Sequence, residues 1–272
     1  MDIGIGSYTF PWHIGVGEDH PATPLTPMRL LEKAVSLNVS LVQICDNMPL
    51  ADMTEDALSQ LALCAQNSGL RIEVGTRGIA PEHLRTYLQL AVFFHSPILR
   101  IVTDTAESHP DMHEIVARLS SVMADFEGAG VVLALENHDR FTADEFVNIM
   151  TCVGSPNIGM CLDTVNSFGA LEGPQVVVQT LAPWVRCLHV KDFAITRASH
   201  QLGFLIEGRP AGQGRLNLPW VMRELRAAGQ TPAAVLELWT PPDASLEATI
   251  EKEARWARES IAYLQNLSID IT

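Results

Sequence analysis

The stretch VVLALENHDRFTADEFVNIMTCVGSPNIGMCLD, residues 131–163, contains one full unit of the fold that we predict: a strand, a helix and the next strand. Its two ends, Val131–Glu136 and Ile158–Asp163, are apolar runs without polar alternation, as is typical of strands covered on both faces. Between them, Ala143–Cys152 has the apolar spacing of an amphipathic helix. The stretch therefore predicts a strand–helix–strand unit of a parallel sheet.

The same unit recurs along the 272 residues, where eight apolar runs alternate with eight amphipathic stretches. This arithmetic matches a (β/α)8 TIM barrel, whereas a doubly wound open sheet of about five or six strands leaves two units without a place. No Pro/Ser-rich linker divides the chain, so we expect residues 1–272 to form a single TIM-barrel domain. The predicted strands are Ile3–Tyr8, Leu41–Cys45, Leu70–Val74, Ile98–Val102, Val131–Glu136, Ile158–Asp163, Arg186–Val190 and Ala234–Leu238. The predicted helices are Met28–Leu37, Glu55–Asn67, Pro81–Phe94, Met112–Glu127, Ala143–Cys152, Gln175–Leu181, Leu218–Ala228 and Leu246–Leu264.

Two predicted connections are much longer than the others. Thr9–Pro27 follows the first predicted strand, and the glycine-rich segment Phe193–Asn217 follows the seventh. In a barrel, the connections after the strands form the mouth, where active sites lie. We therefore predict that both long loops cover the mouth as lids, with variable surface decoration as the alternative.

Composition and charge exclude several classes of partner. The chain is 47% hydrophobic, and its formal net charge of −14 repels nucleic acid and anionic membranes, so we expect neither as a partner. No apolar run reaches the roughly 18 residues that span a bilayer, and no secretory signal pattern is visible. Five cysteines without a C-x-x-C pair indicate reduced thiols, so we expect a cytoplasmic protein.

Four ionisable side chains stand at the ends of four successive predicted strands: Glu136, Asp163, His189 and Glu237. These strands are neighbours in a barrel, so the four side chains should converge at its mouth. Three carboxylates repel one another unless a cation holds them, and three carboxylates with one imidazole suit Mn²⁺, Mg²⁺ or Co²⁺. We therefore predict a divalent metal site; for Asp163 alone, a helix N-cap is the structural alternative.

Five segments are similar to a known family. ALENHD (134–139), CLDTVNSFG (161–169), CLHVKDF (187–193), AGQGRLNLPWVMRELRAAG (211–229) and VLELW (235–239) resemble the xylose isomerase-like TIM-barrel superfamily, in its sugar phosphate isomerase/epimerase and inosose-metabolism branch. The resemblance covers nearly the whole chain and is strongest over Val131–Trp239.

The resemblance implies roles for the four ionisable residues. It implies that Glu136, Asp163, His189 and Glu237 bind the metal, and that Glu136 and Glu237 also serve as the catalytic acid/base pair. It further implies a homodimer or homotetramer. The superfamily also includes dehydratases, decarboxylases and DNA-repair nucleases. The nucleases need several zinc ions, many histidines and a basic groove, unlike this acidic chain with its one well-placed histidine.

One position departs from the pattern D-x-x-H that many epimerases of the group carry after strand 6. Here the segment reads Asp163-Thr-Val-Asn166, and asparagine cannot carry a positive charge near pH 7. The leading interpretation is an isomerase or epimerase of a keto-sugar or inosose that acts through a metal-stabilised enediolate. The alternatives are a dehydratase or decarboxylase of a keto-acid sugar or keto-inositol, and a non-catalytic sugar-binding or partner-dependent subunit.

Further side chains are predicted to contact a small carbohydrate or keto-acid substrate. Lys191 lies two residues after His189, on the same side of the strand, where it can bind a substrate carboxylate or form a salt bridge instead. Trp12 can offer an apolar wall to a sugar ring, or pack in the core. The complete predicted set of substrate-binding residues is Trp12, His138, Asn166, Lys191 and Arg209.

Overall fold

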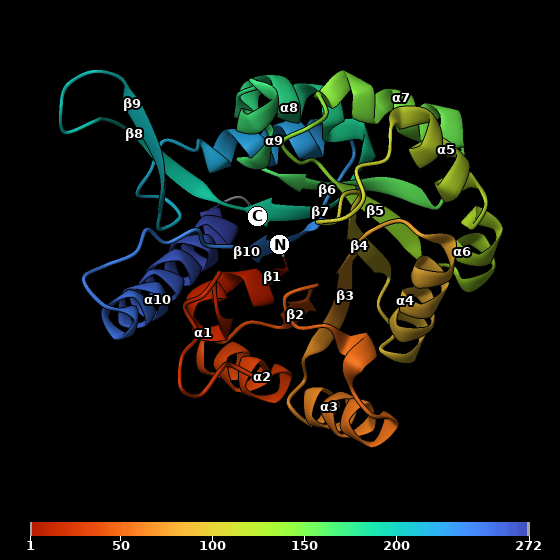
Figure 1. Ribbon diagram of the computed structural model, residues 1–272, viewed down its shortest axis with the longest axis horizontal. Coiled ribbons are helices and arrows are strands. Elements are labelled where there is room, and N and C mark those ends of the chain that lie inside the picture. The colour runs from red at the N-terminus through yellow and green to blue at the C-terminus, as the bar shows by residue number, and fades with distance from the viewer. Residues whose placement is uncertain (1, 271–272) are drawn as a thin grey trace.

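The computed structural model describes residues 2–270, with side chains as far as residue 267. Eight parallel strands close into a barrel in the order β1-β10-β7-β6-β5-β4-β3-β2, with helices around it (Figure 1). The predicted TIM barrel is therefore confirmed, and the open sheet is excluded. The barrel strands are β1 (Ile3–Gly6), β2 (Leu41–Ile44), β3 (Arg71–Arg77), β4 (Ile98–Val102), β5 (Val132–Glu136), β6 (Ile158–Asp163), β7 (Val185–Val190) and β10 (Ala233–Leu236).

Several helices begin or end at capping residues, and α7 shows both kinds of cap. The Thr142 hydroxyl accepts a hydrogen bond from the Glu145 N–H, and the Glu145 carboxylate accepts one from the Thr142 N–H, which together start α7. Gly154, with φ of 65°, ends this helix in the left-handed conformation. The helices are α1 (Pro11–Ile14), α2 (Pro27–Ser36), α3 (Glu55–Asn67), α4 (Pro81–Phe93), α5 (Met112–Ser120), α6 (Met123–Ala129), α7 (Ala143–Val153), α8 (Pro174–Leu181), α9 (Leu218–Ala227) and α10 (Leu246–Asp270).

The helix predicted at Met112–Glu127 is interrupted in the structure. Helix α5 ends at Ser120, and α6 begins at Met123. Between them, the Val122 N–H donates to the Leu119 carbonyl at 3.0 Å, a three-residue spacing that tightens the backbone and ends the regular α-helix. The prediction of one uninterrupted helix was wrong for this reason.

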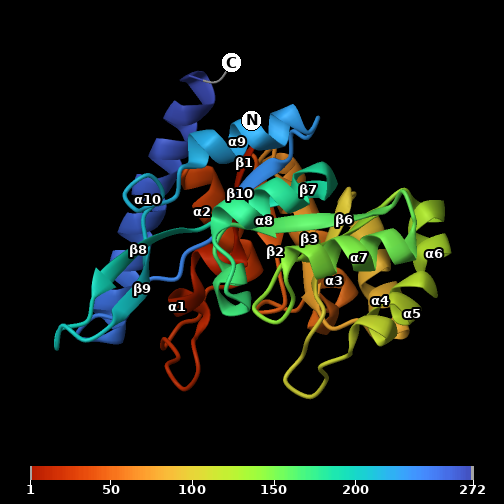
Figure 2. The same cartoon turned by 90° about the horizontal axis from the view of Figure 1, so that it is seen from above.

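Both long connections contain secondary structure. Residues 7–26 include the 3-10 turn Ser7–Thr9 and helix α1. The segment predicted as a plain glycine-rich loop after β7 instead begins with an antiparallel hairpin of β8 (Asp192–Arg197) and β9 (Phe204–Arg209), which projects from the barrel in Figure 1. Figure 2 shows the loop that carries α1 and this hairpin on the side of the barrel away from the N-terminus.

The barrel interior consists of two layers of opposite chemistry. Because side chains two residues apart on a strand share a face, each apolar residue of the lower layer has a polar one above it, towards the mouth. The lower layer is an apolar plug, formed by Leu41, Ile98, Ala134, Cys161, Cys187 and Val235. The polar layer, two residues further along each strand, is buried and consists of Gln43, Arg100, Glu136, Asp163, His189 and Glu237.

The rest of the core lies between the barrel and its helices, where large side chains such as Phe126, Phe146 and Leu30 are fully buried. All five cysteines are free thiols. Over the described residues, no helix is both long enough and apolar enough to cross a membrane. The fold therefore places one polar cluster inside an otherwise apolar barrel.

Candidate metal centre at the mouth of the barrel

The structure brings the four ionisable residues from the strand ends into one cluster. Glu136 and Asp163 end β5 and β6, His189 lies in β7, and Glu237 directly follows β10. Each contributes one potential ligand atom, and these atoms lie within 4.8 Å of one another. The four residues are at most 1% exposed. Their convergence follows from the topology, since they stand on four adjacent strands of the barrel.

Three atoms of this cluster are buried without an aligned hydrogen bond among the described residues: Asp163 Oδ2, His189 Nδ1 and Glu237 Oε1. His189 Nδ1 lies 3.2 Å from Glu136 Oε2 and also 3.2 Å from Glu237 Oε1. Buried polar atoms normally have a bonding partner, so these inward-facing oxygen and nitrogen atoms indicate that a ligand binds between them. One imidazole nitrogen and several carboxylate oxygens suit Mg²⁺, Mn²⁺ or Co²⁺, and the residues present therefore fit a divalent cation.

Asp163 uses its two oxygens differently. Its Oδ1 accepts hydrogen bonds from the N–H groups of Val165 and Asn166, each at 2.8 Å, in the manner of a cap. Its Oδ2 faces the cluster. The N-cap role therefore applies to Oδ1, whereas Oδ2 remains available to a cation. Burial raises the pKa of Asp163, and the neighbouring Lys191 ammonium opposes that rise.

Lys191 supplies a positive charge to the cluster. Its Nζ lies 2.9 Å from Asp163 Oδ2 and 2.9 Å from Glu237 Oε2. Burial lowers the pKa of Lys191, but these two carboxylates outweigh it and raise that pKa well above its usual range. The structure thus shows the salt-bridge alternative for Lys191, with Asp163 and Glu237 as partners. Its contact with substrate stays a prediction.

Sequence reasoning missed Arg100, which holds one side of the cluster. Its Nε donates to Glu136 Oε2 at 2.5 Å, and its Nη1 donates to Asp46 Oδ1 at 2.8 Å. Asn166 Nδ2 donates to Glu136 Oε1 at 2.8 Å, so both oxygens of this carboxylate accept hydrogen bonds. Burial raises the pKa of Glu136, but Arg100 and His189 together hold it well below its usual range. The signal in the sequence was a charge inside the apolar run ILRIV, residues 98–102.

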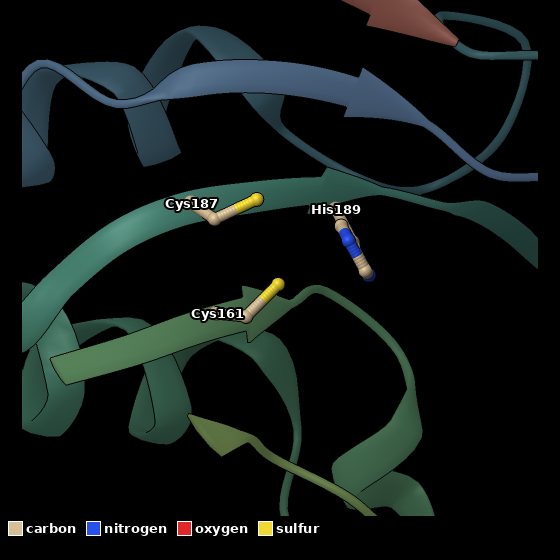
Figure 3. Close-up of side chains that lie close together, drawn as sticks. All are labelled: Cys161, Cys187 and His189. Carbon is tan, nitrogen blue, oxygen red and sulfur yellow. The ribbon is translucent and has the colours of Figure 1, made fainter. Parts of the chain in front are cut away.

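Buried polar groups and thiols form the floor of the cluster. His189 Nε2 lies 2.7 Å from Gln43 Oε1, and Gln43 Nε2 donates to Glu73 Oε2 at 3.1 Å. Figure 3 shows Cys161 on β6 and Cys187 on β7 with their sulfur atoms turned towards each other, beside His189. Because the ring's Nε2 is bonded to Gln43 and its Nδ1 faces the carboxylates, we interpret the two thiols as part of the apolar plug.

Two of the five predicted substrate-binding residues, Asn166 and Lys191, contact the cluster. The Trp12 indole donates to a backbone carbonyl at 2.8 Å, the His138 ring pairs with the next residue at 2.5 Å, and Arg209 donates to the carbonyl of the preceding residue at 2.7 Å. The structure shows no hydrogen bond or ion pair between these three and the four strand-end residues, within residues 2–270. Their contact with substrate stays a prediction.

A pocket of about 250 Å³ opens beside the cluster. Lys191 and Asn166 form its polar side, next to the cluster. Its other walls are mainly apolar and come from three parts of the chain, with Ile206 contributed by the β8–β9 hairpin. The remaining lining residues are Val165, Phe168, Gly169 and Trp239. A small molecule in this pocket would meet the ammonium group on one side and apolar surface on the others.

We expect Glu73→Gln to change how stability depends on pH. Burial raises the pKa of Glu73 to about 8, well above its ordinary value of 4.5. A carboxyl group whose pKa is higher in the folded chain stabilises the fold at low pH, and this stabilisation is lost as the pH rises from about 4.5 to about 8. The variant should therefore be more stable than wild type at pH 8 by roughly 3–5 kcal/mol, at about 1.4 kcal/mol per pKa unit. Urea unfolding at pH 4.5, 6 and 8 measures this; a pH-independent difference contradicts it.

The sequence matches a known family model and is similar to a relative along nearly its whole length. The family model "Xylose isomerase-like TIM barrel" matches residues 31–267. The chain is 31% identical over 264 residues to 3-oxo-isoapionate decarboxylase of Pectobacterium atrosepticum, covering 97% of this chain and 95% of that protein.

Two solved structures share the fold at low sequence identity. One is a xylose isomerase-like TIM-barrel protein from Mycobacterium smegmatis in complex with magnesium, with a TM-score of 0.71 and 15% identity over 96% of this chain and 97% of that one. The other is D-psicose 3-epimerase with D-tagatose from Clostridium cellulolyticum H10, with a TM-score of 0.71 and 18% identity over 99% of both chains.

Proposed function

Because the chain belongs to the xylose isomerase-like TIM-barrel family, we propose that it is a divalent-metal-dependent lyase that decarboxylates a 3-oxo sugar acid. The observation that carries this proposal is that both carboxylate oxygens of Glu136 accept hydrogen bonds, one from Arg100 and one from Asn166. The full-length similarity to a decarboxylase of a 3-oxo acid supports it. Isomerisation or epimerisation on the same metal site is the second candidate, which the fold shared with sugar epimerases favours.

The hydrogen bonds of Glu136 favour a lyase over an epimerase. Epimerisation through an enediolate needs proton-transferring groups on both faces of the substrate. Glu136 is a poor proton acceptor, because Arg100 holds its pKa well below the usual range and both of its oxygens are engaged. Of the predicted acid/base pair, only Glu237 then remains as a group that can transfer a proton. Decarboxylation needs no base to form the enolate, since the electron pair comes from the carbon–carbon bond that breaks.

Glu136, Asp163, His189 and Glu237 would hold the cation. When bound, it supplies the positive charge that polarises a ketone oxygen and stabilises negative charge on it. The carboxylates of Asp163 and Glu237 are then engaged, which leaves the Lys191 ammonium as the nearby group able to bind a substrate anion.

Lys191 and the apolar pocket act on the substrate carboxylate together. The ammonium group orients the carboxylate at the entrance of the pocket, whose walls include Val165, Phe168 and Trp239. An apolar wall disfavours a localised carboxylate charge relative to neutral CO₂. The bond between the carboxylate carbon and the α-carbon breaks, its electron pair moves towards the ketone, and CO₂ leaves. The α-carbon then takes up one proton from the solvent. The product is a keto sugar one carbon shorter.

We expect Lys191→Met to lower kcat/KM for a 3-oxo sugar acid by about 100-fold, which corresponds to about 2.7 kcal/mol, because it removes a buried charge partner of the substrate. The Mn²⁺-loaded enzyme is assayed for CO₂ release and for the mass of the product. The variant should bind Mn²⁺ at least as tightly as wild type, because it removes the ammonium that competes for Asp163 and Glu237.

Lys252→Met serves as the matched control, because Lys252 donates to the Pro241 carbonyl and lies apart from the pocket. It should keep wild-type CO₂ release. An isobaric product from a keto-sugar, with no CO₂ from any 3-oxo acid, would contradict the lyase proposal and favour epimerisation.

A further inference from the structure

We propose that Gln43 and Glu73 are positioning residues that hold a proton on Nε2 of His189, so that its Nδ1 is presented to the cation. This inference rests on the proposed metal site. Gln43 on β2 and Glu73 on β3 are register partners on adjacent strands, whereas His189 lies on β7, so its contact with Gln43 crosses the barrel interior. We call the three side chains the relay.

The relay consists of two successive buried contacts. His189 Nε2 lies 2.7 Å from Gln43 Oε1, and Gln43 Nε2 donates to Glu73 Oε2 at 3.1 Å. Gln43 and His189 are 0% exposed, and Glu73 is 4% exposed. Because water has little access, each polar atom of the relay depends on the next side chain for its hydrogen bond. A substitution at Glu73 should therefore alter the hydrogen bond of His189, although Gln43 lies between the two residues.

The two ends of the Gln43 amide face different chemistry. Its Oε1 faces donors: the His189 ring and the Cys45 thiol, which lies at 3.5 Å. Its Nε2 faces acceptors: Glu73 Oε2 and the Cys187 sulfur, which lies at 3.4 Å. If the amide turned over, its NH₂ group would meet the ring N–H, and its oxygen would meet a carboxyl oxygen. In the observed direction Glu73 Oε2 accepts from the amide whether or not its other oxygen carries a proton, and this bond stabilises that direction.

The direction of the amide determines which ring nitrogen is available. With Gln43 Oε1 as acceptor, the proton on Nε2 of His189 is retained, and Nδ1 is the nitrogen that can offer a lone pair. That nitrogen faces Glu136 and Glu237, at 3.2 Å from each. In metal sites, removal of the group that accepts the second N–H of a histidine ligand typically weakens metal affinity by about 10–100-fold.

The first test is calorimetric titration with Mn²⁺. We expect Gln43→Met to bind Mn²⁺ about 10–100-fold more weakly than wild type, because it lacks the acceptor. Glu73→Met should also bind more weakly, because the amide is then free to turn over. Glu73→Gln should bind more tightly than Glu73→Met, since its side-chain carbonyl can still accept from Gln43. The double variant Gln43→Met/Glu73→Met should be no weaker than Gln43→Met alone, because both act through one path.

Ser96→Ala is the matched control for loss of a buried hydrogen bond. The Ser96 hydroxyl accepts from the Val74 N–H at 3.2 Å and donates to the Ile98 carbonyl at 2.5 Å, without contact to the relay. This variant should lower the melting temperature and leave Mn²⁺ affinity unchanged. A merely structural role for Gln43 and Glu73 predicts the same behaviour for their variants. Wild-type Mn²⁺ affinity in both Gln43→Met and Glu73→Met would therefore overturn the relay.

A second test uses metal-free protein and separates the relay from the metal site. With ¹⁵N-labelled histidine, the Nε2 proton of His189 should give a slowly exchanging signal, assigned by its absence in His189→Asn. The signal should persist in Glu73→Gln and disappear in Gln43→Met and Glu73→Met. If wild type binds no Mn²⁺ but shows this pattern, the proposed metal enzyme fails and the relay stands. If the signal persists in both methionine variants, the relay is wrong.

Discussion

Glu237→Gln is expected to remove the bound cation. In wild type we expect about one divalent ion per chain after Mn²⁺ loading and desalting, held by three carboxylates and one imidazole. The variant replaces an anionic ligand with a neutral amide in a site where Glu237 Oε1 faces the cluster without a hydrogen bond among the described residues. We expect its metal affinity to fall by more than about 100-fold, beyond the range typical of residues that only support a ligand. Activity should fall with it.

Metal analysis and thermal unfolding together measure this effect. A ligand that binds only the folded state stabilises it by about 2.7 kcal/mol when its free concentration is 100 times Kd. Mn²⁺ should therefore raise the melting temperature of wild type but not of Glu237→Gln. Each protein is compared with its own metal-free form, because Glu237→Gln also removes the charge of a buried partner of Lys191. Glu251→Gln is the control, because Glu251 is an exposed carboxylate on α10. A Glu237→Gln protein that retains one ion per chain would refute the assigned ligand set.

Arg100→Met is expected to produce the largest loss of stability of any variant proposed. Arg100 is 2% exposed and is paired with both Glu136 and Asp46. Its removal leaves two carboxylates without their main counter-charge, one of them fully buried. Breaking a buried ion pair by removing one partner destabilises proteins by about 3–5 kcal/mol. We expect a loss of this size in the free energy of unfolding of the metal-free protein, measured with urea.

An exposed ion pair provides the comparison for Arg100. Arg85 pairs with Glu82 and Asp125 on the surface, and we expect Arg85→Met to change stability by less than about 1 kcal/mol. Saturating Mn²⁺ should recover part of the loss in Arg100→Met, because the cation gives Glu136 a new counter-charge. Equal effects of the two variants would show that the Arg100 pairs contribute no more than surface pairs.

Much of the fold follows from local patterns in the chain. The runs Ile98–Val102 and Ile158–Asp163 form strands with the predicted bounds, because an uninterrupted apolar run has few other ways to bury both faces. Alternation of such runs with amphipathic helices then leaves the closed barrel as the arrangement that accommodates eight units. The hairpin was harder to predict, since its alternating residues stand beside glycines that are typical of loops.

The strand-end residues of the site were visible in the sequence, but their partners were not. A side chain at the end of a barrel strand points to the mouth whatever its neighbours are. Gln43, Glu73 and Arg100 lie in the middle of strands, where a polar residue in an apolar run looks like an exception. Their pairing depends on how the closed barrel aligns its strands: Arg100 reaches Asp46, which is 54 residues away and follows β2, two strands along the barrel. That information appears only when the barrel has closed.

Lys191 gives the metal-free chain a counter-ion of its own. Small zinc domains unfold without their metal, because binding supplies most of their folding energy. Here the ammonium group already pairs with Asp163 and Glu237. The barrel also has a large apolar core to which the cluster does not contribute. We therefore expect newly synthesised chains to survive proteolysis during metal starvation. Cellular metal supply would then set the active fraction of the enzyme rather than its abundance, and activity could recover without new protein synthesis.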